Sequence, residues 1–131
     1  MEIIVHLTDA PIDPAAFPTH LEKPGISGAR VEFRGVVRVE EAGRKIQGLR
    51  YEAYGSMAEK LMREIICDLA VQHPCQAVTV IHRHGLIPVG ECAVHIEAWA
   101  EHRAEAFAMV MQFLDRLKRD VPIWKTEAVW A

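Results

Sequence analysis

The chain has 131 residues, of which 50% are hydrophobic and 25% are charged, and its formal net charge is −3. This length suits a single domain, residues 1–131, with one hydrophobic core. A general nucleic-acid binder carries a basic excess, so the acidic balance argues against a nucleic-acid partner. The N-terminal apolar run is too short for a signal peptide and no stretch reaches the length of a membrane span, so we expect a cytoplasmic protein without a membrane partner.

The first third of the chain is predicted to be mostly β-structure. Residues 2–8 are typical of a strand, and Asp13-Pro14 favours a short helix because proline suits the first helical position. The alternating segment 27–38 predicts a second strand. Residues 40–48 are polar and bounded by glycine, which indicates a loop or a hairpin tip, and residues 49–54 predict the next strand.

A long helix is expected to follow. Ser56 and Glu59 have the S-x-x-E spacing of a capping box, so the helix should begin at Ser56. It should end near His73-Pro74, because the residue before a proline disfavours helix. Its apolar face repeats every four residues, at Met57, Leu61, Ile65 and Leu69.

The remaining elements complete an α+β pattern. Residues 76–85 and 91–101 predict two strands, and the five residues "LIPVG" between them suggest the turn of an antiparallel hairpin. A last helix should run from near His102 to about Arg119, where Pro122 prevents its continuation. We therefore expect helices packed on a mainly antiparallel sheet. The core stripe expected for the last helix consists of Phe107, Val110, Met111, Leu114 and Leu117.

Cysteine and histidine chemistry is expected to be absent. Cys67, Cys75 and Cys92 include no C-x-x-C pair and lie in or beside apolar segments, which favours small buried hydrophobes over a catalytic thiol. His82 and His84 fall on one face of a predicted strand and His95 on its neighbour, so a metal site is an alternative. Solvated or hydrogen-bonded strand histidines are the favoured interpretation, and we expect no metal.

Two lysines near the end of the chain flank an apolar segment that contains Pro122 and Trp124. Lys118 follows Leu114 by four residues, so it should lie on or beside the buried stripe of the last helix. Partial desolvation would lower its pKa and make the amine usable as a nucleophile or acid/base group. The alternative is a lysine that buries only its stem, and Lys125 could equally be an ordinary edge-strand lysine.

Three further cations suggest an anion site. Arg38 ends a strand just before a loop, and His102 and Arg103 begin the last helix, where free N–H groups and the helix dipole favour phosphate or carboxylate. Arg103 and Lys118 are fifteen residues apart on that helix, or roughly 22 Å at 1.5 Å per residue. If both residues belong to one site, a second subunit must supply one of them, which implies a homodimer with sites across its interface.

Five segments together resemble a known family. "FRGVVR", "LRYEAYGSMAEK", "VTVIHRHGLIPVGE", "EHRAEAF" and "LKRDVPIWKTE" occur in the order and spacing of the catalytic (large) subunit of molybdopterin synthase, the MoaE family. The resemblance covers about Ser27 to Glu127. It implies an α/β-hammerhead fold and a sulfurtransferase that converts cyclic pyranopterin monophosphate to molybdopterin by dithiolene formation.

The same resemblance implies the partners and the site. The sulfur would arrive as a thiocarboxylate on the C-terminal Gly-Gly of a small ubiquitin-like carrier, whose tail enters a pocket of the large subunit. Two large subunits would form a central dimer with one carrier at each end. No cofactor is implied. Pro122 and Trp124 would stiffen the segment that orients Lys125. By position, the implied site comprises the catalytic pair Lys118 and Lys125, the anion-binding Arg38, the pocket walls Phe33 and Leu114, and, from the other subunit, His102 and Arg103.

Some residues depart from the family pattern. Glu40 and Glu41 follow Arg38 where neutral or basic residues are more usual, and Thr126 replaces a second basic residue. The family's chains usually continue with a longer tail that contributes another basic residue across the dimer, whereas this sequence ends at Ala131. The departures motivate an alternative function, a non-catalytic dimeric paralogue that binds the carrier without turnover.

Overall fold

The structure is a computed structural model that describes residues 1–17 and 25–131. The α+β class expected from the sequence is confirmed, and Asp13 caps the predicted short helix by accepting a hydrogen bond from the backbone N–H of Ala15. Within the described residues, no helix combines the length and apolar character that crossing a membrane requires. In chain order the elements are β1 (Glu2–Thr8), η1 (Pro14–Ala16), β2 (Ala29–Val36), β3 (Glu40–Glu41), β4 (Arg44–Ala53), α1 (Gly55–Ala70), β5 (Ala77–Arg83), β6 (Gly85–Pro88), β7 (Cys92–Ala100), α2 (Arg103–Asp120) and β8 (Ile123–Trp130).

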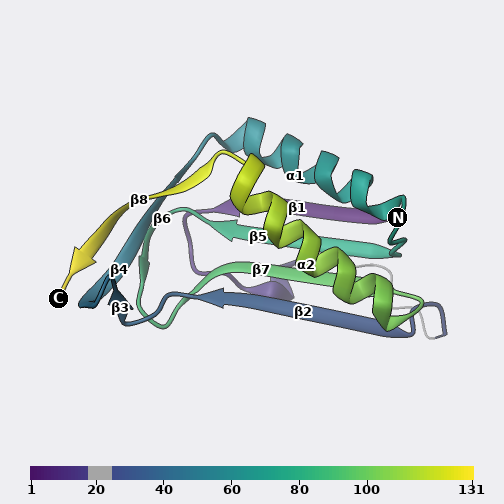
Figure 1. Ribbon diagram of the computed structural model, residues 1–131, viewed down its shortest axis with the longest axis horizontal. Helices are drawn as coiled ribbons and strands as arrows, with labels where there is room; N and C mark the ends of the chain where they lie inside the picture. Colours follow the sequence, from purple (N-terminus) through teal and green to yellow (C-terminus); the bar gives the residue numbers. More distant parts are fainter. Residues whose placement is uncertain (18–24) are drawn as a thin grey trace.

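The first sheet has the strand order β1-β5-β7-β2, and both long helices cover the same face of it (Figure 1). The predicted antiparallel pairing of β5 with β7 is confirmed, whereas β1 runs parallel to β5. Val80 of β5 and Ile96 of β7 are fully buried in one core with Met62 of α1 and Phe113 of α2. This core fixes the position of α2 over the sheet, and thereby the position of the last turn of α2.

The second sheet is built around β4, which pairs antiparallel with β3, β6 and β8. It forms the left end of the molecule in Figure 1, where α2 ends and the chain continues into β8. A small separate core of Val37, Ile46, Leu49, Ile87 and Ala93 holds this sheet together. The two sheets therefore meet at the junction of α2 and β8, between the two lysines singled out in the sequence.

Residues 40–48 were predicted as a loop or a hairpin tip, and the hairpin is confirmed, whereas the "LIPVG" segment differs from the predicted turn. Residues 40–48 form a tight hairpin, in which Glu41 pairs with Arg44 and the two-residue turn has positive φ at Ala42 (51°) and Gly43 (78°). Such a turn matches the twist of a hairpin, and glycine accepts its geometry without strain. The "LIPVG" segment is not a simple turn, because its first three residues, 86–88, belong to β6 and pair with β4. No local pattern reveals the pairing of residues 85–88 with β4.

The start of α1 differs from the prediction. The helix begins at Gly55 with Tyr54 as N-cap, and no side chain caps it, so the predicted capping box is wrong. Glu59 instead accepts a hydrogen bond from the backbone N–H of Leu7 in β1, at 3.4 Å. Met57 is 57% exposed, and the fully or nearly fully buried residues of this helix are Ala58, Met62, Ile65 and Ile66. The side of α1 that faces the core is therefore rotated from the predicted one.

The buried side of α2 is also rotated. Phe107 and Met111, predicted to lie in the core, are 61% and 65% exposed. The residues that face the sheet are Ala106, Met109, Val110, Phe113 and Leu117. This helix carries two neighbouring apolar stripes, and only its packing against β7 and β2 decides which one is buried. The exposed stripe remains available on the surface.

Candidate active site

A cavity of about 640 Å³ lies where the two sheets and the end of α2 meet. We call it the lysine pocket, because Lys118 from α2 and Lys125 from β8 both line it. Phe33 of β2, Arg38 and Leu114 of α2 line it as well. Five residues far apart in the sequence, all singled out there as site residues, are thus brought to one cavity.

The junction between α2 and β8 determines how the two lysines are presented. The helix closes with a hydrogen bond from the N–H of Val121 to the carbonyl of Leu117, and the chain then turns at Pro122. Lys125 lies opposite Tyr51 of β4 in the strand register. Both lysines are exposed, so the expectation that Lys118 is desolvated is wrong for the single chain. Lys118 directly follows the buried Leu117 on the helix, which places its stem at the edge of the core and its amine in the open pocket.

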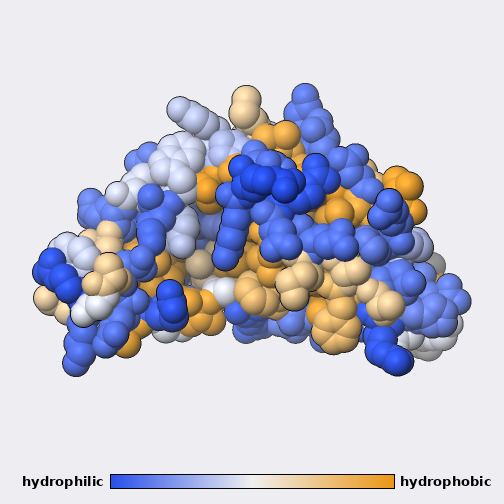
Figure 2. Space-filling model, in the orientation of Figure 1, coloured by the Kyte–Doolittle hydropathy of each residue, from blue (hydrophilic) through white to orange (hydrophobic). Residues whose placement is uncertain are grey.

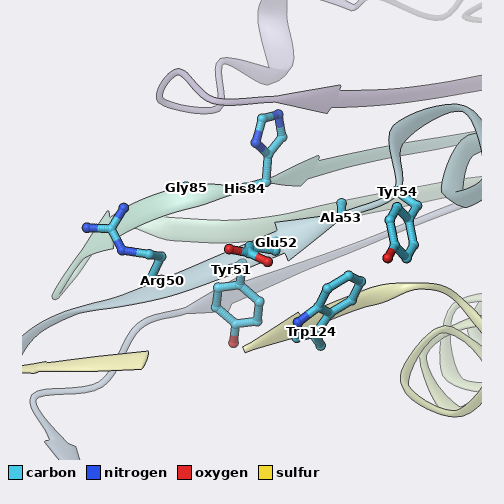
Figure 3. Close-up of a pocket in the computed structure, with 8 residues that line it drawn as sticks. All are labelled: Arg50, Tyr51, Glu52, Ala53, Tyr54, His84, Gly85 and Trp124. Carbon is cyan, nitrogen blue, oxygen red and sulfur yellow. The ribbon is translucent and has the colours of Figure 1, made fainter. Parts of the chain in front are cut away.

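Tryptophan and proline in the segment between the lysines anchor β8. The carbonyl of Pro122 accepts a hydrogen bond from the N–H of Tyr54, and the Tyr54 and Trp124 rings lie 5.3 Å apart. Successive side chains of a strand point to opposite faces, so Trp124 and Lys125 lie on opposite sides of β8. Figure 3 shows Tyr54 and Trp124 side by side at a second, smaller recess of about 390 Å³, which shares Tyr51 with the lysine pocket.

Glu41 also lines the lysine pocket and contacts a predicted catalytic residue. Its Oε1 lies 2.5 Å from Nζ of Lys125. The hydrogen bond from Lys125 lowers the pKa of Glu41, as does the Lys125 charge, with a smaller contribution from Arg38, while partial burial opposes the shift. Glu41 was noted in the sequence as an acid near an anion site, but its pairing with a residue 84 positions later was not predicted.

His82 supplies a neutral imidazole at the wall of the pocket. Its Nδ1 lies 2.8 Å from the carbonyl oxygen of Arg83, and because a carbonyl can only accept, Nδ1 carries the proton. Nε2 is then an unprotonated acceptor. Burial lowers the pKa of His82 and the nearby His84 adds to this, although the bond to Arg83 opposes it. The Tyr51 ring packs edge-on against the His82 ring, with centroids 5.9 Å apart. Tyr51 and His82 both line the lysine pocket, and neither was predicted from the sequence as a site residue.

His102 and Arg103 do not line the lysine pocket. They lie at the opposite end of α2, where His102 is the N-cap residue and both side chains are exposed. Because α2 is unbroken from Arg103 to Asp120, the separation of roughly 22 Å worked out from the sequence holds. Within one chain, these residues therefore cannot reach a molecule held by Lys118.

Three histidines considered as a metal site do not converge. Ile81 pairs with His95 in the register of β5 and β7, so His95 shares a face with Ile81 and not with His82. His95 instead lies between carboxylates, with Nε2 3.5 Å from Glu97 and Nδ1 3.5 Å from Glu32. No group of three or more potential metal ligands is present among residues 1–17 and 25–131.

The cysteines are all unpaired, and none lines the lysine pocket. Cys75 is buried, and this burial raises the pKa of its thiol to about 11, with a further contribution from Glu105. A thiol with that pKa is almost entirely protonated at neutral pH and is a poor nucleophile. The charged groups available for chemistry in the pocket are therefore cations and carboxylates.

Comparison with known proteins identifies the family of the chain. The family model described as MoaE protein matches residues 7–120. The molybdopterin synthase catalytic subunit of Oryza sativa subsp. indica is 40% identical over 101 residues, which are 77% of this chain and 52% of the rice protein. The human molybdopterin synthase catalytic subunit is 40% identical over 102 residues, which are 78% of this chain and 54% of the human protein. The chain thus spans about half the length of these curated relatives.

Solved structures share the fold over nearly the whole chain. Molybdopterin synthase from Staphylococcus aureus superposes with a TM-score of 0.83 at 32% identity, covering 99% of this chain and 90% of that one. A chain from the complex of subunits 1 and 2 of molybdopterin-converting factor from Helicobacter pylori gives a TM-score of 0.73 at 18% identity, covering 98% and 89%. With the family model matching most of its length, the chain belongs to the MoaE family.

Proposed function

We propose that this protein is a sulfurtransferase that converts cyclic pyranopterin monophosphate to molybdopterin, using the C-terminal Gly-Gly thiocarboxylate of a small ubiquitin-like carrier. The observation that carries the proposal is the convergence of Lys118, Lys125 and Arg38 on one cavity of about 640 Å³. Both proposed reactants are anionic, and a cavity lined by three cations suits them. Membership of the MoaE family and the names of the curated relatives support the same activity.

Each side chain of the pocket has a proposed role. The guanidinium of Arg38 can bind the substrate phosphate through two parallel hydrogen bonds. Lys118 and Lys125 can hold the carboxyl end of the carrier and stabilise the negative charge that develops as its sulfur is transferred. Phe33 and Leu114 provide an apolar wall for the pterin and the tail. No cysteine of this chain is needed, because the sulfur comes from the carrier.

We further propose a homodimer in which His102 and Arg103 of one subunit reach the lysine pocket of the other. The length of α2 supports this arrangement, because Arg103 lies too far from Lys118 on one helix to reach the same pocket. The exposed apolar residues Phe107 and Met111 of α2 and Phe33 and Val36 of β2 also support it, since they offer a surface for a second copy. Hydrophobic side chains are visible over this side of the molecule in Figure 2. With one carrier on each subunit, the assembly would be a heterotetramer, and we place it in the cytoplasm.

The alternative is a non-catalytic paralogue that binds the carrier without turnover. The ion pair between Glu41 and Lys125 favours it, because it neutralises one of the proposed catalytic lysines. The two functions differ in whether product forms after the carrier is bound.

Reconstitution with thiocarboxylated carrier and cyclic pyranopterin monophosphate tests the proposal. We expect dithiolene product from the unaltered chain and a loss of at least about a hundredfold in Lys118→Ala and in Lys125→Ala, the size typical for removal of one electrostatic catalytic group. Lys60→Ala, an exposed lysine of α1, is the matched control and should retain full activity. Carrier binding without product would support the paralogue, and full activity in either pocket variant would refute the assigned roles.

A further inference from the structure

We propose that Glu41 is an internal competitor for Lys125, which the carboxyl end of the carrier must displace. This inference rests on the proposed function, since it deepens the role of the lysine pocket. Glu41 Oε1 contacts Lys125 Nζ at 2.5 Å, the shortest salt bridge among the described residues. A carboxylate in that position occupies the place on the ammonium group that an incoming carboxylate would take.

The hairpin that carries Glu41 holds its carboxylate over the pocket. Glu41 is the last residue of β3, and the turn at Ala42 and Gly43 follows directly. The backbone N–H of Ile46 donates to the carbonyl of Val39, which anchors the base of the hairpin. The carboxylate remains partly accessible, with the Glu41 side chain 27% exposed and that of Lys125 41% exposed. An ion pair with this accessibility is weak enough for an incoming anion to displace.

Glu41 makes the two lysines different. Lys118 forms no salt bridge within residues 1–17 and 25–131, whereas Lys125 is neutralised by Glu41. Besides these groups, the titratable lining of the pocket includes Arg38 and Asp115. An arriving carboxylate therefore meets the unpaired ammonium of Lys118 first, and Lys125 becomes available only when Glu41 moves away.

The same competition assists release. After sulfur transfer, the carrier ends in an ordinary carboxylate, which the cations of the pocket would continue to hold. Glu41 can return to Lys125 as that carboxylate leaves, so it replaces the lost contact and lowers the residence time of the spent carrier. Glu41 is in this sense a positioning residue, since it acts on Lys125 and not on the substrate.

Substitution of Glu41 tests the inference, with its neighbour as a matched control. Glu41→Gln keeps the size and hydrogen-bonding capacity of the side chain but removes its charge. Glu40→Gln makes the same change on the adjacent residue, which does not line the lysine pocket. The ligand is purified carrier with an unmodified C-terminal carboxylate, titrated calorimetrically at low and high salt.

We expect Glu41→Gln to bind this carrier about two- to fivefold more tightly than the unaltered chain, the factor that corresponds to one exposed ion pair. High salt should reduce the difference, and Glu40→Gln should match the unaltered chain. In turnover, Glu41→Gln should lower both KM for the carrier and kcat, because release slows. Independently of any carrier, Lys125 should react faster with an acylating reagent in Glu41→Gln, as followed by mass spectrometry.

The result that overturns the inference is equal or weaker carrier binding by Glu41→Gln. A failure of the proposed function looks different. A non-catalytic paralogue would bind the carrier, with the same difference between Glu41→Gln and Glu40→Gln, but would form no product. A chain with no part in this chemistry would bind no carrier as the unaltered protein, as Glu40→Gln or as Glu41→Gln. That outcome rejects both the activity and the competition at its site. Unchanged acylation of Lys125 in Glu41→Gln would reject the ion pair itself.

Discussion

Mixing two inactive variants should restore activity if the active site is shared between subunits. In Lys118→Ala the chain keeps Arg103, and in Arg103→Ala it keeps Lys118. About 22 Å of unbroken helix separates the two positions within one chain. A site that uses both residues must therefore combine Lys118 of one chain with Arg103 of the other.

The expected recovery follows from that geometry. In a mixed dimer, one site lacks both residues and the other site is intact. Random exchange between equal amounts of the two variants makes about half of the dimers mixed, so about a quarter of all sites should be intact. We expect activity near a quarter of that of the unaltered protein after co-refolding, measured as dithiolene product per subunit.

The matched control combines Lys118→Ala with Lys125→Ala. Both lysines line the pocket of the same chain, so a mixed dimer of these variants contains no intact site and should remain inactive. Native mass spectrometry can establish that mixed dimers form in both experiments. Mixed dimers of Lys118→Ala and Arg103→Ala without recovered activity would refute the shared site.

Two further predictions concern groups outside the lysine pocket. Hydrogen bonds from His95, and then from Arg30 and Trp99, lower the pKa of Glu97 from 4.5 to about 2 despite its burial. This carboxylate therefore contributes stability that is complete above pH 4.5 and is lost as the pH falls toward 2, about 3 kcal/mol in all. In urea unfolding between pH 2 and pH 7, the free energy of unfolding of Glu97→Gln should fall less steeply toward acid pH than that of the unaltered protein. An equal fall in both proteins would contradict the lowered pKa of Glu97. Cys67 is exposed whereas burial raises the pKa of Cys75 to about 11, so a thiol reagent at pH 8 should label Cys67 much faster, as peptide mapping can check.

Local patterns in the sequence were sufficient for elements whose partners are their neighbours. Strands β1, β5 and β7 and the end of α2 could be predicted because alternation, length and a proline are properties of the segment itself. The side of α2 that faces the core could not, since Phe107 and Met111 are as apolar as the buried Met109 and Phe113. Only the sheet against which the helix packs distinguishes the two stripes.

The site shows the same division. Helix periodicity and the spacing of the lysines pointed to the end of α2, and the position of Arg38 before a loop suggested an anion site. The family resemblance added Phe33 and Leu114 as pocket walls. The contact between Glu41 and Lys125 spans 84 positions, and it depends on where the hairpin at residues 40–48 lies relative to β8, which the local pattern does not determine. The burial expected for Lys118 was wrong because adjacency to an apolar stripe does not determine whether the end of a long side chain reaches solvent.

At the junction around Pro122, the number of residues between α2 and Lys125 matters more than which residues they are. Because strand side chains alternate, one residue inserted between Asp120 and Lys125 would turn the amine to the side where Trp124 now packs on Tyr54. Substitutions in this segment leave that orientation intact, whereas insertions and deletions reverse it. The seven-residue interval between the two lysines is therefore a criterion for sorting divergent relatives: a sequence that keeps both lysines but alters the interval has lost the geometry of the pocket.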